Sequence, residues 1–161
     1  VMLLKTESAG LVLADIPLLY MVYSISYAGL SLHAGQMSHR VGARTMIFAG
    51  YLFLIASYAV LAFAGSVPLL LAGFLLLGSF PAMTDGVQRS FAAQLSSDSL
   101  RGGGLGWLSA ATGFGALLAG IGGGYLWQTA GPATAFATAA AIVVTGLALF
   151  AASAFQAQPA A

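Results

Sequence analysis

Charged residues divide this chain into long apolar stretches. No Asp, Glu, Lys or Arg occurs within residues 16–39, 45–84 or 102–161. A helix of about 20 apolar residues crosses the hydrocarbon core of a bilayer, so each stretch is long enough to span it. Turn residues interrupt the longer stretches at Gly65-Ser66-Val67-Pro68 and at Gln128-Thr129-Ala130-Gly131-Pro132. The pattern predicts an all-α membrane protein with five spans, at about residues 16–37, 45–64, 68–95, 103–127 and 133–155.

Composition supports the same class. The 161 residues are 60% hydrophobic and 6% charged, whereas a soluble domain carries roughly 25% charged residues. The lipid bilayer is therefore the expected surroundings. A net charge of +1 is too small to indicate nucleic acid as a partner. The chain has no cysteine, no metal-ligand spacing and no nucleophile–base pattern, so we expect no enzymatic activity, no metal and no cofactor.

The first residues predict that the chain is a fragment. Residues 1–5 are apolar but too short to span a membrane, so we interpret them as the end of a helix whose body precedes Val1. A polar connector, Thr6-Glu7-Ser8-Ala9-Gly10, separates them from the first full span.

The arginines predict an orientation. With five spans, the loops at 38–44 and 96–102 lie on one side of the membrane. That side holds Arg40, Arg44 and Arg101, with Arg89 close by, whereas the opposite side holds Lys5. By the positive-inside rule the arginine side is cytoplasmic. We expect an integral protein of the plasma (inner) membrane.

A polar stripe runs along the first span. Five residues fall within about 60° of one direction at helical periodicity: Tyr20, Tyr23, Ser24, Tyr27 and Ser31. An interfacial tyrosine belt does not fit, because the stripe covers about 16 Å along the helix axis. A face that lines a substrate cavity and a buried helix contact with hydroxyls bonding across it are the two remaining interpretations, and the first is favoured because phenols at membrane depth need polar partners. His33, on the other side of this helix, is interpreted as a packing residue.

Two further groups stand out in the later spans. Asp85 and Arg89 are spaced i, i+4, so they can pair on one helix face. The pair is interpreted as a structural anchor of the helix end, as a gate latch, or as a contact for a coupling ion or substrate. The fourth span is rich in glycine, and Gly120 and Gly124 form a small-xxx-small pair. With Gly113 they predict close packing against another helix, and a hinge is the alternative.

The segment Gly35–Arg44 carries a family resemblance. Its pattern G-x-M-S-H-R-V-G-A-R resembles the G-x-L-x-D-R-x-G-R-R signature of the major facilitator superfamily (MFS). Leu100-Arg101-Gly102 ahead of a glycine-rich helix is similar to the start of that family's eleventh helix, and Pro17-Leu18-Leu19-Tyr20 to its eighth. The resemblance implies the C-terminal half of such a protein: the end of helix seven and helices eight to twelve. The fold is then a six-helix half-bundle whose first helix is mostly missing.

The signature transfers residue by residue, with two departures. Gly35, Arg40, Gly42 and Arg44 match the family's glycines and basic residues, whereas His39 replaces the signature aspartate and Ala43 a basic residue. The resemblance implies that the aspartate belongs to a charge network latching the cytoplasmic side. We expect Asp85 or Asp98 to serve Arg40 instead, and we expect the latch to be weaker.

The resemblance implies a secondary transporter that moves a small solute by alternating access. Its expected partners are the lipid bilayer, the missing N-terminal half, an unidentified small-molecule substrate and, as a candidate, a coupling ion. A fragment of this length is not expected to transport alone. The alternative is a non-transporting membrane scaffold or subunit, which explains the glycine-rich packing without a wet tyrosine face.

Overall fold

The computed structural model describes residues 16–95 and 101–156, and all of the regular structure in these ranges is helical. Its helices follow in the order α2 (Ile16–Val41), α3 (Ala43–Phe63), α4 (Val67–Leu95), α5 (Arg101–Ala130) and α6 (Pro132–Gln156). The predicted end of helix seven and the connector after it lie outside the described residues.

Glycine and proline set the ends of these helices. Gly42 and Gly131 have φ angles of 88° and 84°, a region that residues with a Cβ occupy only at a steric cost. They form the single-residue turns between α2 and α3 and between α5 and α6. Pro132 then opens α6, where its missing N–H has no helical partner to lose.

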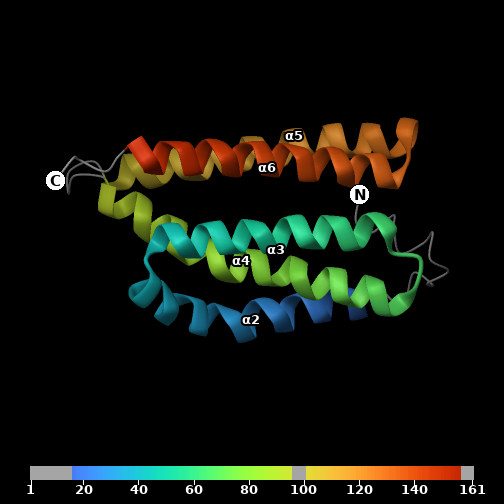
Figure 1. Cartoon of the computed structure of the whole chain (residues 1–161), viewed down its shortest axis with the longest axis horizontal. Coiled ribbons are helices and arrows are strands. Elements are labelled where there is room, and N and C mark those ends of the chain that lie inside the picture. Colours follow the sequence, from blue (N-terminus) through green and yellow to red (C-terminus); the bar gives the residue numbers. More distant parts are fainter. Residues whose placement is uncertain (1–15, 96–100, 157–161) are drawn as a thin grey trace.

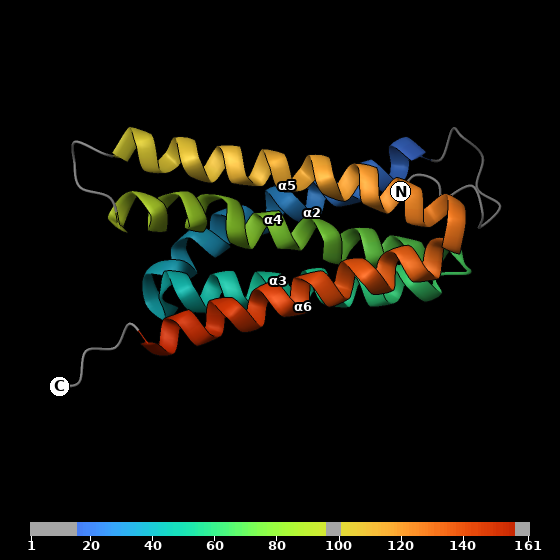
Figure 2. The same ribbon diagram turned by 90° about the horizontal axis from the view of Figure 1, so that it is seen from above.

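The helices run back and forth as an elongated bundle (Figure 1). The most extensive contacts join α3 to α4 and α2 to α4, and α6 packs on α3. The α5 helix contacts α6 and, to a smaller extent, α4. Seen from above, α6 follows α3 closely, while α5 runs along the opposite edge of the bundle (Figure 2). The turn after α2, the end of α4 and the start of α5 therefore gather at one end of the bundle.

Small residues let α3 and α4 approach closely. A Cβ on Gly50 would lie 2.5 Å from Cγ2 of Thr84, and one on Gly73 would lie 2.5 Å from Cδ2 of Leu61. Between these points the buried Ser57 hydroxyl donates to the Gly73 carbonyl at 2.9 Å. This combination of small residues and hydroxyl bonds is typical of helix packing in lipid.

Two apolar clusters fill the bundle. One, toward the α3–α4 turn, is centred on buried residues of α2, α3, α4 and α6: Leu19, Leu61, Ala64, Leu70, Phe74 and Phe136. The other, toward the α2–α3 turn, contains Ala34, Met46, Ile47 and Val87. Together they hold α2, α3 and α4 in one unit, with α6 on its outer side.

Four segments of the described chain are long and apolar enough to cross a membrane. They are Ala43–Phe63, Val67–Gln94, Gly102–Ala130 and Pro132–Ala152. The all-α membrane half-bundle predicted from the sequence is confirmed in fold class. The α2 helix, which carries the tyrosine and serine stripe, is not among these segments, so its role as a fifth span stays a prediction.

Candidate functional site

The signature turn joins α2 to α3. The last turn of α2 carries His39 and Arg40, where positive charge favours the negative end of the helix dipole. The Gly42 N–H donates to the Ser38 carbonyl at 3.0 Å, and its positive φ directs the chain into α3. The second glycine of the signature is therefore a conformational requirement of the turn.

The arginines of the signature have different surroundings. The Arg44 guanidinium lies 5.8 Å from the centre of the Phe91 ring, a cation–π distance that joins the start of α3 to the end of α4. Arg40 is exposed and forms no ion pair with any residue that the structure describes. Asp98 lies outside the described residues, as does the side chain of Arg101, so Asp98 as a partner of Arg40 stays a prediction.

A polar cleft of about 350 Å³ opens between α2 and α4. It brings together residues that the sequence placed in separate groups. From α2 come two members of the stripe and two of the signature, and from α4 comes the carboxylate: Tyr27, Ser31, Gly35, His39 and Asp85. Ser38 and Ser90 add hydroxyls, and Pro81, Ala82, Gly86 and Val87 complete the lining. We refer to this site as the α2–α4 cleft.

Asp85 is the one carboxylate within the described ranges, and it is exposed. Arg89 lies one turn later on the same helix, and its positive charge acts on the Asp85 carboxylate. The two side chains do not form an ion pair. The carboxylate is therefore free to meet a partner that enters the α2–α4 cleft.

The tyrosine stripe lies largely on the surface of this chain. Tyr20 is 64% exposed and Tyr27 38%, and the Tyr20 ring stacks on that of Tyr23 at 5.7 Å between centroids. The hydroxyls of Ser24 and Ser31 donate to carbonyls of their own helix, those of Tyr20 and Ala28, at 2.8 and 3.0 Å. Tyr23, Ser24 and Ser31 are half-buried, and Tyr23 packs against the first apolar cluster, so a cavity lining and a helix contact both stay predictions for the stripe.

The glycines of α5 have no close neighbours. A Cβ built on Gly113, Gly120 or Gly124 would meet nothing within 4 Å, and no residue of the α5 span is buried. Their predicted close packing is therefore not made with the part of the chain described, and close packing and a hinge both stay predictions.

Sequence reasoning missed the hydroxyl contacts that fix α2 on α4. The Ser26 hydroxyl donates to the Leu75 carbonyl at 2.8 Å and lies 3.1 Å from the hydroxyl of Ser79. Serines are common on membrane helices, so nothing in the pattern singled these two out. The hydrogen bond from Nε2 of Gln88 to the Tyr51 hydroxyl, at 3.3 Å, was also missed. A glutamine in an apolar span could have indicated it, because such a side chain needs a polar contact.

The fold and the signature turn define a membrane protein of a transporter family. The family profile described as Major Facilitator Superfamily matches residues 2–161. The chain belongs to this superfamily.

Two relatives agree with this assignment. One is an uncharacterized MFS-type transporter of Methanocaldococcus jannaschii, 31% identical over 132 residues, which cover 81% of this chain and 33% of the relative. The other is the MFS-type transporter ppzB of Metarhizium rileyi, 30% identical over 128 residues, which cover 77% of this chain and 26% of the relative. The chain thus spans about a third or less of these relatives. No solved structure gives a significant match.

Proposed function

We propose that this chain is the C-terminal half of a secondary transporter that moves a small solute by alternating access. In such folds the substrate binds near the bilayer midplane between two repeats that rock around it. The observation that carries the proposal is the α2 surface, where phenols and hydroxyls extend along about 16 Å of the helix. Tyr20 and Tyr27 are exposed there and the other members of the stripe are half-buried, and Tyr27 and Ser31 continue into the α2–α4 cleft.

The residues have distinct roles in this proposal. Tyr20, Tyr23, Ser24 and Tyr27 line the substrate path, and the cleft forms its cytoplasmic end. There His39 and Asp85 face a shared space with Ser31 and Ser90, as a gate needs. The carboxylate is also the natural contact for a coupling ion.

The missing N-terminal half completes the site. The exposed stripe and the open surroundings of Gly120 and Gly124 are polar and small-residue surfaces that lipid covers poorly. The matched regions cover 33% and 26% of the two relatives, which leaves room for that half. Loops 38–44 and 96–102 are then cytoplasmic, in the plasma (inner) membrane.

Cysteine accessibility along α2 tests this proposal. This chain contains no cysteine, so once any cysteines in the rest of the full-length protein are replaced, single cysteines can be introduced one at a time at Tyr20, Tyr23, Ser24 and Tyr27. A membrane-impermeant maleimide is expected to label these positions. The controls are Ile25→Cys and Leu32→Cys, which are exposed on the other side of the helix and are expected to face lipid. Equal protection of all six positions would contradict a water-filled cavity and favour the scaffold alternative.

A further inference from the structure

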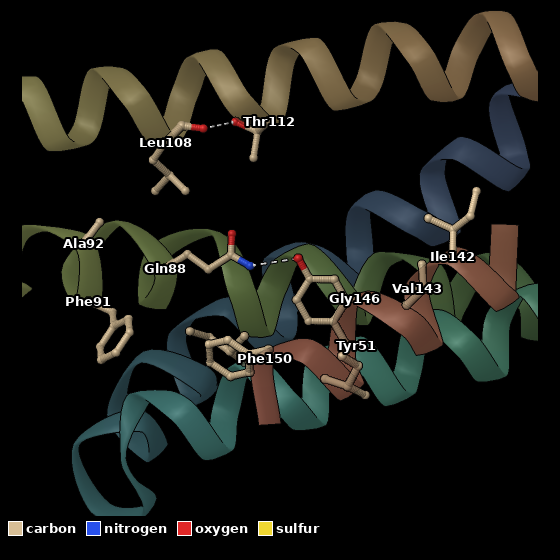
Figure 3. Close-up of a pocket in the computed structure, with 12 residues that line it drawn as sticks. Tyr51, Gln88, Phe91, Ala92, Leu108, Thr112, Ile142, Val143, Gly146 and Phe150 are labelled. Atoms are coloured by element: carbon tan, nitrogen blue, oxygen red, sulfur yellow. Dashed lines mark hydrogen bonds between the residues drawn. The ribbon is translucent and has the colours of Figure 1, made fainter. Parts of the chain in front are cut away.

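A second cavity lies away from α2 and opens to the surface, since Thr112, Ile142 and Gly146 of its lining are exposed. It has a volume of about 520 Å³ and lies between α3, α4, α5 and α6 (Figure 3). We refer to it as the α3–α6 cavity. All of its lining residues fall within the four segments that can cross a membrane. Its size is that of a typical site for a small organic ligand.

The lining is uncharged and mostly apolar. Its three polar side chains are Tyr51, Gln88 and Thr112. Ile47, Phe91, Leu108, Ile142, Leu147 and Phe150 supply most of the surface. The Thr112 hydroxyl is occupied, since it donates to the Leu108 carbonyl at 2.7 Å. Tyr51 and Gln88 are therefore the groups left to bind a polar atom.

The Tyr51–Gln88 pair has one donor and one acceptor to offer. Nε2 of Gln88 donates to the Tyr51 hydroxyl oxygen at 3.3 Å, which leaves the phenol O–H as a donor. Figure 3 shows the Gln88 carbonyl oxygen directed toward α5, into the space below Leu108 and Thr112. Among the described residues neither group has another hydrogen bond. A hydroxyl group matches such a pair, because it accepts one hydrogen bond and donates another.

The lining offers no charge that could bind an ionic head group at this position. None of the twelve lining residues is charged, and an ion without a counter-charge in an apolar cavity is strongly disfavoured. A hydrocarbon body, in contrast, gains from leaving water or from filling an empty apolar space.

We propose that the α3–α6 cavity binds a neutral amphiphile from the membrane, with its hydroxyl head group between Tyr51 and Gln88 and its hydrocarbon body against α5 and α6. The site is separate from the proposed substrate path, because α2 contributes no residue to it. A further cavity of about 410 Å³ shares Ile142 and Val143 with it and continues along α5. A bound amphiphile would therefore add packing contacts to α5, which packs less extensively on its neighbours than the other helices do.

A photoreactive long-chain alcohol tests this site. The natural full-length protein is reconstituted in nanodiscs with hexadecanol that carries a diazirine on its chain. Adducts mapped by mass spectrometry are expected on the buried or half-buried lining residues Ile47, Phe91, Leu147 or Phe150. Untagged hexadecanol is expected to compete with the probe and reduce its labelling. Hexadecane is expected to compete about tenfold less well, because it lacks the hydroxyl and loses one or two hydrogen bonds. Adducts confined to the exposed positions Val144 and Leu149 would overturn the proposal.

Two variants separate the body of the site from its head-group contact. Gly146 lines the cavity and has open space where its Cβ would be, so Gly146→Leu is expected to fill the site and reduce labelling about tenfold. Its control is Ala148→Leu, an exposed position two residues away on α6, which is expected to label normally.

Gln88→Leu is expected to remove the preference for hexadecanol over hexadecane while keeping the adducts. Equal labelling of Gly146→Leu and Ala148→Leu, or a preference for hexadecanol that survives in Gln88→Leu, would contradict the proposal. The adduct map of the unmodified protein decides the case if a variant fails to fold.

Discussion

Gly78 of α4 lies directly against the backbone carbonyl of Tyr23 on α2. A Cβ at Gly78 would clash with that carbonyl and would lie 3.0 Å from Cβ of Ser26. This contact sets the distance between α2 and α4 beside the Ser26–Ser79 hydroxyl contact. It thereby fixes where the tyrosine stripe stands relative to Asp85.

Gly78→Val is expected to force α2 away from α4. Its neighbour is backbone, which cannot rotate aside, so we expect a loss of about 1–3 kcal/mol in the free energy of unfolding, as for other overpacked sites. Chemical unfolding in detergent micelles measures this loss. Gly29→Val is the control, since nothing lies within 4 Å of a Cβ there. Equal losses in both variants would show that the α2–α4 contact is not as close as described.

Ser57→Ala tests the hydroxyl contact between α3 and α4. The variant leaves the Gly73 carbonyl without its side-chain donor and is expected to lower the free energy of unfolding by about 0.5–1.5 kcal/mol. Thr145→Ala is the matched control, because the exposed Thr145 hydroxyl donates to Ala141 of its own helix. A control loss as large as that of Ser57→Ala would argue against the interhelical bond as the cause.

The two glycines of the signature are expected to respond differently to alanine. Gly42 has φ 88° and ψ 147°, a region that is essentially restricted to glycine, so Gly42→Ala is expected to reduce stability by about 1–3 kcal/mol. Gly35 lies within α2 with open space around it, so Gly35→Ala is expected to be neutral or slightly stabilising. Thermal unfolding of the two variants side by side measures the difference. The reverse order would contradict the assigned turn.

His39→Asp tests the proposed gate. His39 and Asp85 line the same cleft, and an aspartate at position 39 restores the family's signature beside Arg40. We expect the variant to shift the full-length protein toward the state closed on the cytoplasmic side, seen as reduced cytoplasmic labelling of a cysteine at position 31.

Gln36→Asp, also exposed on α2 but outside the cleft, is the control for the added charge. Unchanged labelling in His39→Asp, or an equal effect of Gln36→Asp, would show that position 39 is not part of the latch.

Much of the fold could be predicted because charge and turn residues mark the ends of apolar helices. The chain reverses at Gly42 and Gly131, where the sequence places its turns. Helix pairing was harder to predict, since the approach at Gly78 depends on which face of α4 meets α2. The same applies to the α2–α4 cleft: Tyr27 and Asp85 are far apart in the sequence, and only packing brings them to one space. Gly120 and Gly124 show the opposite case, since the sequence predicts close packing there and a Cβ on either would meet nothing within 4 Å among the described residues.

Accessibility of Tyr27→Cys from each side of the membrane is the most direct test of alternating access along α2. Tyr27 belongs to both the stripe and the cleft, so in an alternating-access transporter it faces each side in turn. Sealed vesicles of known orientation, containing the full-length protein, are treated with an impermeant maleimide from outside or inside. Alternating access predicts labelling from both sides. Cytoplasmic labelling is expected to be lost when the cytoplasmic end is cross-linked shut. Labelling from one side alone, or from neither, would contradict it.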